Sequence, residues 1–240
     1  MTELNPYQSP VLLDEPPRSD VFYTSRLAGL RYAEIWRISS NWRSFLDGLL
    51  SKVLRWPGTI YTAFKPFAPF KLLDESELPA GGREKVLPVL ESCRQLGLQL
   101  AFFCTTERRD LHEAFTVHCL NQSGTIAAAL IWVRIRSRHI EMERQQCVLQ
   151  SWLSDDAVLS TSNERQMLDA PAVFQRMHLP GASVADLLQI HSERLQAVPL
   201  GQVQSLDRDR LLERMNANKR CLAEYHVRRG YWVPARPPVV

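Results

Sequence analysis

The stretch TIAAALIWVRIR at residues 125–136 decides the predicted fold. Its odd positions from 127 to 135 are all apolar, whereas its even positions pass from Ile126 through Trp132 to Arg134 and Arg136. An alternation with a period of two residues is typical of a β-strand that buries one face. We therefore predict a strand here, with a second face that changes from apolar to polar along its length.

Four neighbouring segments also have the composition of strands: residues 98–106, 114–120, 139–153 and 157–163. The run Asn121 to Gly124 is typical of a hairpin turn. Parallel pairing needs crossover connections of about a dozen residues, and these connections are shorter. The sequence therefore predicts an antiparallel meander of about four or five strands.

Helices are predicted before and after this meander in the sequence. One covers residues 84–96 and ends before Gly97, and a second begins at Ser183, whose side chain can cap it. A third runs from about Ser205 to Arg229. Together with the meander, these flanking helices predict an α+β fold.

The N-terminal part of the chain is predicted to be a helical extension. Residues 41–56 repeat apolar side chains at the spacing of one wide helical stripe. A connector rich in proline and glycine follows. We expect a disordered tail at 1–20, a helical extension and connector at 21–82, and an α+β domain with C-terminal helices at 83–240.

Composition limits the classes of function. The 240 residues carry a formal net charge of +3, so a nucleic-acid partner is not favoured. The five cysteines form no C-x-x-C pair, which favours free thiols over a disulfide framework or a zinc site. We expect no cofactor and no metal. The N-terminus lacks the features of a secretory signal, and a cytoplasmic location is expected.

Tryptophan and arginine residues are predicted to share the second face of the sheet. The expected group consists of His118, Trp132, Arg134, Arg136 and Trp152. Trp and Arg are enriched at binding hot spots, and paired arginines hold carboxylate or phosphate groups. The favoured hypothesis is a noncatalytic binding module for a small anion or a protein partner. The alternative is an outer face covered by a helix, with the arginines at its rim.

The predicted helix 41–56 offers a second surface. Its relevant side chains are Trp42, Arg43, Lys52, Arg55 and Trp56. Tryptophan and basic groups suit the headgroup region of an anionic bilayer, so peripheral attachment to the inner membrane face is one interpretation. Packing on the main domain or on a second subunit is the other.

Catalysis has two candidate arrangements. His191 lies on the inner stripe of its helix, where it is either a general base or ligand, or a core histidine bonded to the backbone. Cys104 and His118 lie on consecutive strands and would suit a small hydrolase if they approached each other. No obvious turn supplies the donors for an oxyanion, so a noncatalytic role is favoured.

Two motifs resemble known sequences. The run NPYQSP at residues 5–10 resembles the NPYxSP tag near the N-terminus of many planctomycete proteins. The run SWLSDDAVLSTSN at 151–163, with LPGAS at 179–183 and a helix carrying His191, resembles a family of uncharacterised bacterial α+β proteins. This resemblance implies an α+β fold and brings no known activity.

Overall fold

The computed structural model describes residues 19–39, 41–53, 64–105, 113–136, 141–199 and 201–235. Contacts divide the chain into two compact units. Unit 1 combines residues 1–68 with 219–240, and unit 2 contains residues 69–218. This division differs from the predicted one, because it begins the main unit before residue 83 and assigns the C-terminal segment to the unit that holds the N-terminal helices.

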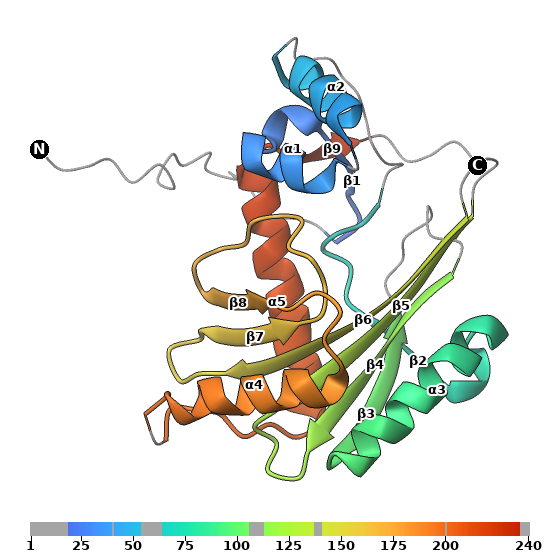
Figure 1. Ribbon diagram of the computed structural model, residues 1–240, viewed down its shortest axis with the longest axis vertical. Coiled ribbons are helices and arrows are strands. Elements are labelled where there is room, and N and C mark those ends of the chain that lie inside the picture. The colour runs from blue at the N-terminus through green and yellow to red at the C-terminus, as the bar shows by residue number, and fades with distance from the viewer. Residues whose placement is uncertain are drawn as a thin grey trace, which may run out of the picture. The chain divides into compact units, whose positions relative to one another are not determined.

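Unit 2 is built on a seven-stranded mixed sheet with the order β2-β3-β4-β5-β6-β7-β8 (Figure 1). Its strands are β2 (Lys71–Leu73), β3 (Leu98–Thr105), β4 (Glu113–Asn121), β5 (Ala127–Arg136), β6 (Glu141–Trp152), β7 (Val158–Ser162) and β8 (Phe174–His178). The first six pair antiparallel, and β8 pairs parallel to β7. The α+β class is confirmed, and the meander of β3 to β7 is present within the sheet.

The predicted limit of four or five antiparallel strands is wrong. It omitted β2, whose three residues lie in the segment taken for a connector, and β8, which follows β7 after residues 163–173. That connection is about as long as a parallel crossover needs. Neither strand has the length or the clear alternation that identifies a strand from sequence.

The first face of the sheet is covered by α3 (Ala80–Gln95) and α4 (Val184–Gln196). These helices bury Val86, Leu90, Cys93 and Leu187 against the strands. Local residues fix the end of α3 and the start of α4. Gly97 has a φ of +82° just beyond α3, and the Ser183 side chain accepts a hydrogen bond from the Asp186 backbone at the start of α4.

The second face meets the part of α5 (Arg208–Arg228) that belongs to unit 2. Trp152 of β6 donates its indole N–H to Asn218 over 3.4 Å. The segment before α5 is held by Leu206, whose backbone N–H donates to the Gly124 carbonyl at 2.9 Å. Gly124 has a φ of +70°, and a Cβ there would lie 2.2 Å from the Leu206 carbonyl oxygen, so only glycine fits this turn.

Unit 1 joins the two ends of the chain. Strand β1 (Phe22–Ser25) pairs antiparallel with β9 (Trp232–Ala235), and the 3-10 turn η1 (Leu27–Gly29) leads to α1 (Tyr32–Ile38) and α2 (Trp42–Val53). A Cβ on Gly29 would lie 2.3 Å from the backbone nitrogen of Tyr231. The N-terminal extension therefore contains helices, as predicted, and it also contains strand β1, which pairs with β9 near the end of the chain.

Candidate docking surface

One side of α2 carries four large apolar side chains that are exposed to solvent: Trp42, Leu46, Leu50 and Val53. They follow each other at intervals of three or four residues, so they fall within an arc of about 80° around the helix axis. Trp42 is 60% exposed and Val53 is 64% exposed. These residues belong to the wide stripe that the sequence predicts, but they do not face the interior.

Helix α1 covers only the other half of that stripe. Gly48 faces α1 so closely that a Cβ there would lie 2.7 Å from Cγ2 of Ile35. Beside this contact, the rings of Phe45 and Trp36 meet edge to face, with centroids 5.1 Å apart. Phe45 and Leu49 are accordingly half-buried. The rest of the stripe is exposed, and the Trp42 ring lies 5.5 Å from that of Phe45 on the same helix.

The charged side chain of Lys52 points inward beneath α2. Its ammonium group donates to the carbonyl of Ala28 at 2.8 Å and to that of Leu30 at 2.5 Å, and it lies 5.3 Å from the centre of the Tyr32 ring. Burial lowers the pKa of Lys52, and the charge of Arg229 acts in the same direction. The inner side of α2 is thus partly polar, while much of its apolar side faces solvent.

Helix α1 adds two aromatic rings to the exposed region, because Tyr32 and Trp36 are each more than half exposed. We define the α1–α2 apolar surface as Tyr32, Trp36, Trp42, Leu46, Leu50 and Val53. It contains six of the ten large hydrophobic side chains that are exposed in the part of the chain that the structure describes. Tyr32 and Trp36 were not among the predicted site residues, although their spacing of four residues places them on one helix face.

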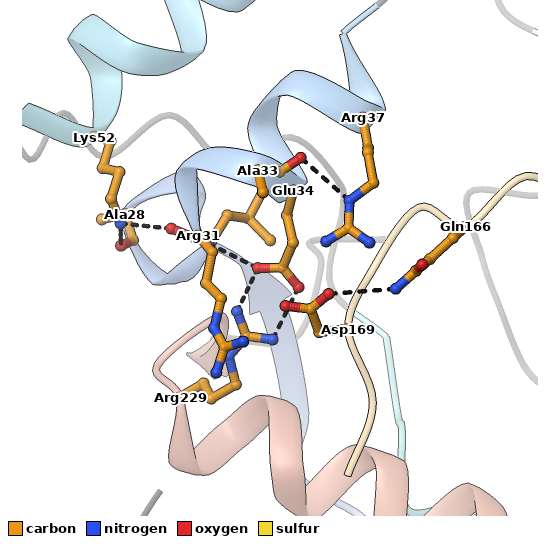
Figure 2. A network of polar contacts seen from close by, with 10 residues as sticks. Ala28, Arg31, Ala33, Glu34, Arg37, Lys52, Gln166, Asp169 and Arg229 are labelled. Carbon is orange, nitrogen blue, oxygen red and sulfur yellow. Dashed lines mark hydrogen bonds and ion pairs between the residues drawn. The ribbon is translucent and has the colours of Figure 1, made fainter. Parts of the chain in front are cut away.

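An ion pair fixes the base of this helical pair (Figure 2). The carboxylate of Glu34 accepts the Arg31 backbone N–H at 2.7 Å, which caps the first turn of α1. The same carboxylate accepts two hydrogen bonds from the Arg229 guanidinium, one of them at 2.9 Å. Glu34 is fully buried. Helix α1 is therefore anchored by the C-terminal segment, and α2 is held in turn by α1 and η1.

The residues predicted for helix 41–56 have different positions. Trp42 and Arg43 are exposed, as a docking role requires. Lys52 turns inward and is not available to a headgroup. Arg55 and Trp56 lie outside the described residues.

The predicted group on the sheet does not share one face. The residue opposite His118 is Ala129, and the residue opposite Phe115 is Trp132. Opposite residues in an antiparallel pair lie on the same face, and consecutive residues alternate. Trp132 and Arg134 therefore point to the α3 side, whereas His118 points to the other. Trp152 also lies on the second face, because its neighbour Ser151 is on the α4 side.

On the α3 side, Trp132 is buried and Arg134 is half-buried. Trp132 is fully buried and donates its indole N–H to Glu143 at 2.9 Å. Arg134 lies 3.9 Å from the carboxylate of Glu113. The side chain of Arg136 is not among those described. Anion binding by these arginines stays a prediction, and this geometry adds no support to it.

His118 lies on the second face in an aromatic setting. Its ring lies 4.8 Å from that of Phe102 and 6.3 Å from that of Phe70, and its Nε2 atom is buried without a hydrogen-bond partner among the described residues. Burial lowers the pKa of His118 to about 4. Cys104 shares this face, since its opposite residue on β4 is Thr116, and it is fully buried. The predicted thiol and imidazole are therefore both buried on the second face.

His191 forms a buried hydrogen-bond chain with strands β6 and β7. Its Nε2 atom lies 3.0 Å from the Ser151 hydroxyl, and its Nδ1 atom lies 2.9 Å from the Thr161 hydroxyl. Arg194 donates to Thr161 at 2.7 Å, and Ser151 donates to the Thr125 carbonyl at 2.6 Å. Ser151, Thr161 and His191 are all fully buried.

The protons in this chain have one consistent assignment. Ser151 uses its only hydrogen on the Thr125 carbonyl, so it accepts the remaining bond from Nε2 of His191. Nδ1 then accepts from Thr161, whose oxygen accepts from Arg194. Burial lowers the pKa of His191 to about 4, and the charge of Arg194 acts in the same direction. A neutral imidazole that donates to the serine does not remove its proton, so this geometry is that of a structural histidine.

A shallow hollow of about 440 Å³ lies at the start of α5. Its lining includes Arg210, Glu213 and Arg214. Arg214 already donates to Asp156 and to Gln204, each at 2.8 Å. None of the residues predicted as site residues lines this hollow.

Metal sites, membrane-spanning helices and similarity to known proteins give no further indication of function. Within the described residues, no group of three or more His, Cys, Asp or Glu side chains is arranged to hold a metal ion. No helix in this part of the chain combines the length and the apolar character needed to cross a bilayer. Searches with family models, curated proteins and solved structures found no match to the chain. The α1–α2 apolar surface is therefore the feature of the described residues that points to a function.

Proposed function

We propose that the protein attaches reversibly to the surface of a lipid bilayer through the α1–α2 apolar surface. One observation carries this proposal: α2 exposes Trp42, Leu46, Leu50 and Val53 on one side, while Lys52 is turned toward the protein. Exposed apolar groups that gather on one surface mark an interaction site. An amphipathic helix with this arrangement lies in the plane of the bilayer, with its apolar side in the interface.

The aromatic residues of this surface suit the boundary of a bilayer. Tyr32, Trp36 and Trp42 each combine a large apolar ring with one polar group. Such side chains prefer the boundary between headgroups and acyl chains, where both parts are accommodated. The surface also lies on two adjacent helices whose contact is already formed through Gly48 and Ile35. Binding therefore needs little new ordering of the backbone, which otherwise costs affinity.

Vesicle flotation with the full-length chain tests the proposal. The probes are vesicles of phosphatidylcholine alone and vesicles that also contain phosphatidylserine. We expect the wild-type chain to float with vesicles. Leu50→Asp should lower the bound fraction about tenfold or more, because it places a charge where the bound protein inserts an apolar side chain into the bilayer interface.

The matched control is Leu72→Asp, which makes the same change at an exposed leucine of β2 in unit 2. We expect it to float like the wild type. The proposal fails if the wild type does not float with either vesicle, or if Leu50→Asp and Leu72→Asp have equal effects. Dimerisation that disappears in Leu50→Asp, without any flotation, would instead assign the surface to a second copy of the chain.

A further inference from the structure

The two units of the chain carry opposite net charges. Unit 1 has 13 Lys and Arg residues and seven Asp and Glu residues, a surplus of six positive charges. Unit 2 has 16 basic and 19 acidic residues, a surplus of three negative charges. The overall charge of +3 hides this difference. The apolar surface belongs entirely to the basic unit.

We infer that unit 1 recognises anionic lipid headgroups, so that a negatively charged bilayer is the partner of the α1–α2 apolar surface. This inference rests on the proposed function and adds the chemistry of the lipid to it. A basic segment near an anionic leaflet is attracted by the surface potential, and each Lys or Arg close to the headgroups strengthens binding. The apolar side chains supply insertion, and the exposed basic side chains of unit 1, such as Arg43, supply the choice of membrane, whereas the inward-facing Lys52 does not contribute.

Two oppositely charged residues lie at the edge of the exposed arc on α2. Arg43 projects about 20° from the direction of Leu50, and Asp47 about 60° from it, as the 100° step of a helix requires. Both are exposed. When Leu50 enters the interface, both side chains reach the level of the headgroups. Arg43 then attracts an anionic surface, and Asp47 opposes it.

A nucleic acid is also a polyanion, but its surface does not match this one. Nucleic-acid grooves and phosphates offer little apolar area for side chains such as Leu46, Leu50 and Val53 to bury. Burying exposed aliphatic groups requires an apolar phase, which the acyl chains of a bilayer provide. The combination of aliphatic side chains with a basic surplus therefore favours an anionic membrane.

Opposite neutralising substitutions on α2 test the inference. Arg43→Gln and Asp47→Asn are measured in the full-length chain by flotation with the two vesicle types. On vesicles with phosphatidylserine, we expect Arg43→Gln to weaken binding about fivefold and Asp47→Asn to strengthen it about fivefold, the effect of one charge near such a surface. On phosphatidylcholine vesicles neither change alters binding. Added salt should reduce the difference between the two vesicle types.

The outcomes separate this inference from the proposed function. If the wild type floats equally with both vesicle types and Leu50→Asp abolishes flotation, attachment stands and the anionic preference is overturned. If Arg43→Gln and Asp47→Asn both leave binding to phosphatidylserine vesicles unchanged, the assignment to these charges fails. No flotation with any vesicle overturns both proposals. Retention of the chain on single-stranded or duplex DNA without flotation would assign the basic surplus to nucleic acid and overturn the inference.

Discussion

The Arg229 guanidinium donates hydrogen bonds to both carboxylate oxygens of Glu34, although the two residues are 195 positions apart in the chain. Burial alone would lower the pKa of Arg229, but the hydrogen bonds and the charge of Glu34 outweigh this effect and raise it. The pair joins α1 to the residue that directly follows α5. The α1–α2 apolar surface therefore depends on the C-terminal segment for its support.

Removing one member of this pair should destabilise unit 1 strongly. Arg229→Met removes the guanidinium that donates two hydrogen bonds to the buried carboxylate of Glu34, which costs about 3–5 kcal/mol. Urea unfolding measures the loss. The matched control is Arg228→Met at the exposed neighbouring position, where we expect a change within about 0.5 kcal/mol. Equal effects of the two substitutions would contradict a structural role for the ion pair.

Two adjacent glycines at the start of α3 should respond oppositely to alanine. A Cβ on Gly82 would lie 2.5 Å from the Phe115 ring and 2.7 Å from the Trp132 ring, so Gly82→Ala should destabilise by about 1–3 kcal/mol despite its better helix propensity. A Cβ on Gly81 would meet only the mobile end of Arg134 at 3.2 Å. Gly81→Ala should be neutral or stabilise by up to about 1 kcal/mol. Thermal unfolding of both variants checks the contrast.

The two buried histidines should make the fold sensitive to acid. Burial lowers the pKa of both His118 and His191 from the ordinary value of 6.5 to about 4. As the pH falls from about 6.5 to about 4, the unfolded chain therefore takes up protons that the folded chain does not. Each histidine should reduce the free energy of unfolding by up to about 1.4 kcal/mol per pH unit in this window.

A substitution at His118 isolates its share of this effect. His118→Leu removes a titrating group whose Nε2 atom has no hydrogen-bond partner among the described residues. Relative to the wild type, the variant should gain about 2 kcal/mol between pH 7 and pH 5. Urea unfolding at both pH values measures the difference. If the two proteins lose stability in parallel, His118 is not buried as a neutral group.

The hydrogen-bond chain around His191 predicts one tautomer. Nitrogen NMR of the imidazole at neutral pH should show a protonated Nε2 and an unprotonated Nδ1. Thr161→Val removes the donor to Nδ1 and should destabilise the fold by about 1–3 kcal/mol, because a buried acceptor is left without a partner. A protonated Nδ1 in the wild type would mean that His191 accepts from Ser151, and would restore the histidine as a candidate base.

The sequence predicted the elements with strong local signals. The alternation in β5, the glycine beyond α3 and the capping residue Ser183 were each sufficient to place an element. The short strands β2 and β8 could not be found, since a few residues carry no reliable period and their pairing depends on neighbours distant in sequence.

The candidate site was predicted only in part. The apolar stripe of α2 was visible as a pattern, because helical spacing is a local property. Which half of the stripe would remain exposed depended on the small contact area of α1 and on Gly48. The sequence also could not show that His118 and Trp132 lie on opposite faces, because that requires the register between β4 and β5.

By itself, the sequence determined an α+β chain with one amphipathic N-terminal helix, because hydrophobic period and capping chemistry act within a few residues. Only the tertiary structure decided that the two chain ends form one basic unit, that Glu34 meets Arg229, and that Lys52 turns inward while Trp42 and Leu50 face solvent. These relationships join residues far apart in the chain, and the packing that brings them together leaves no local pattern in the sequence.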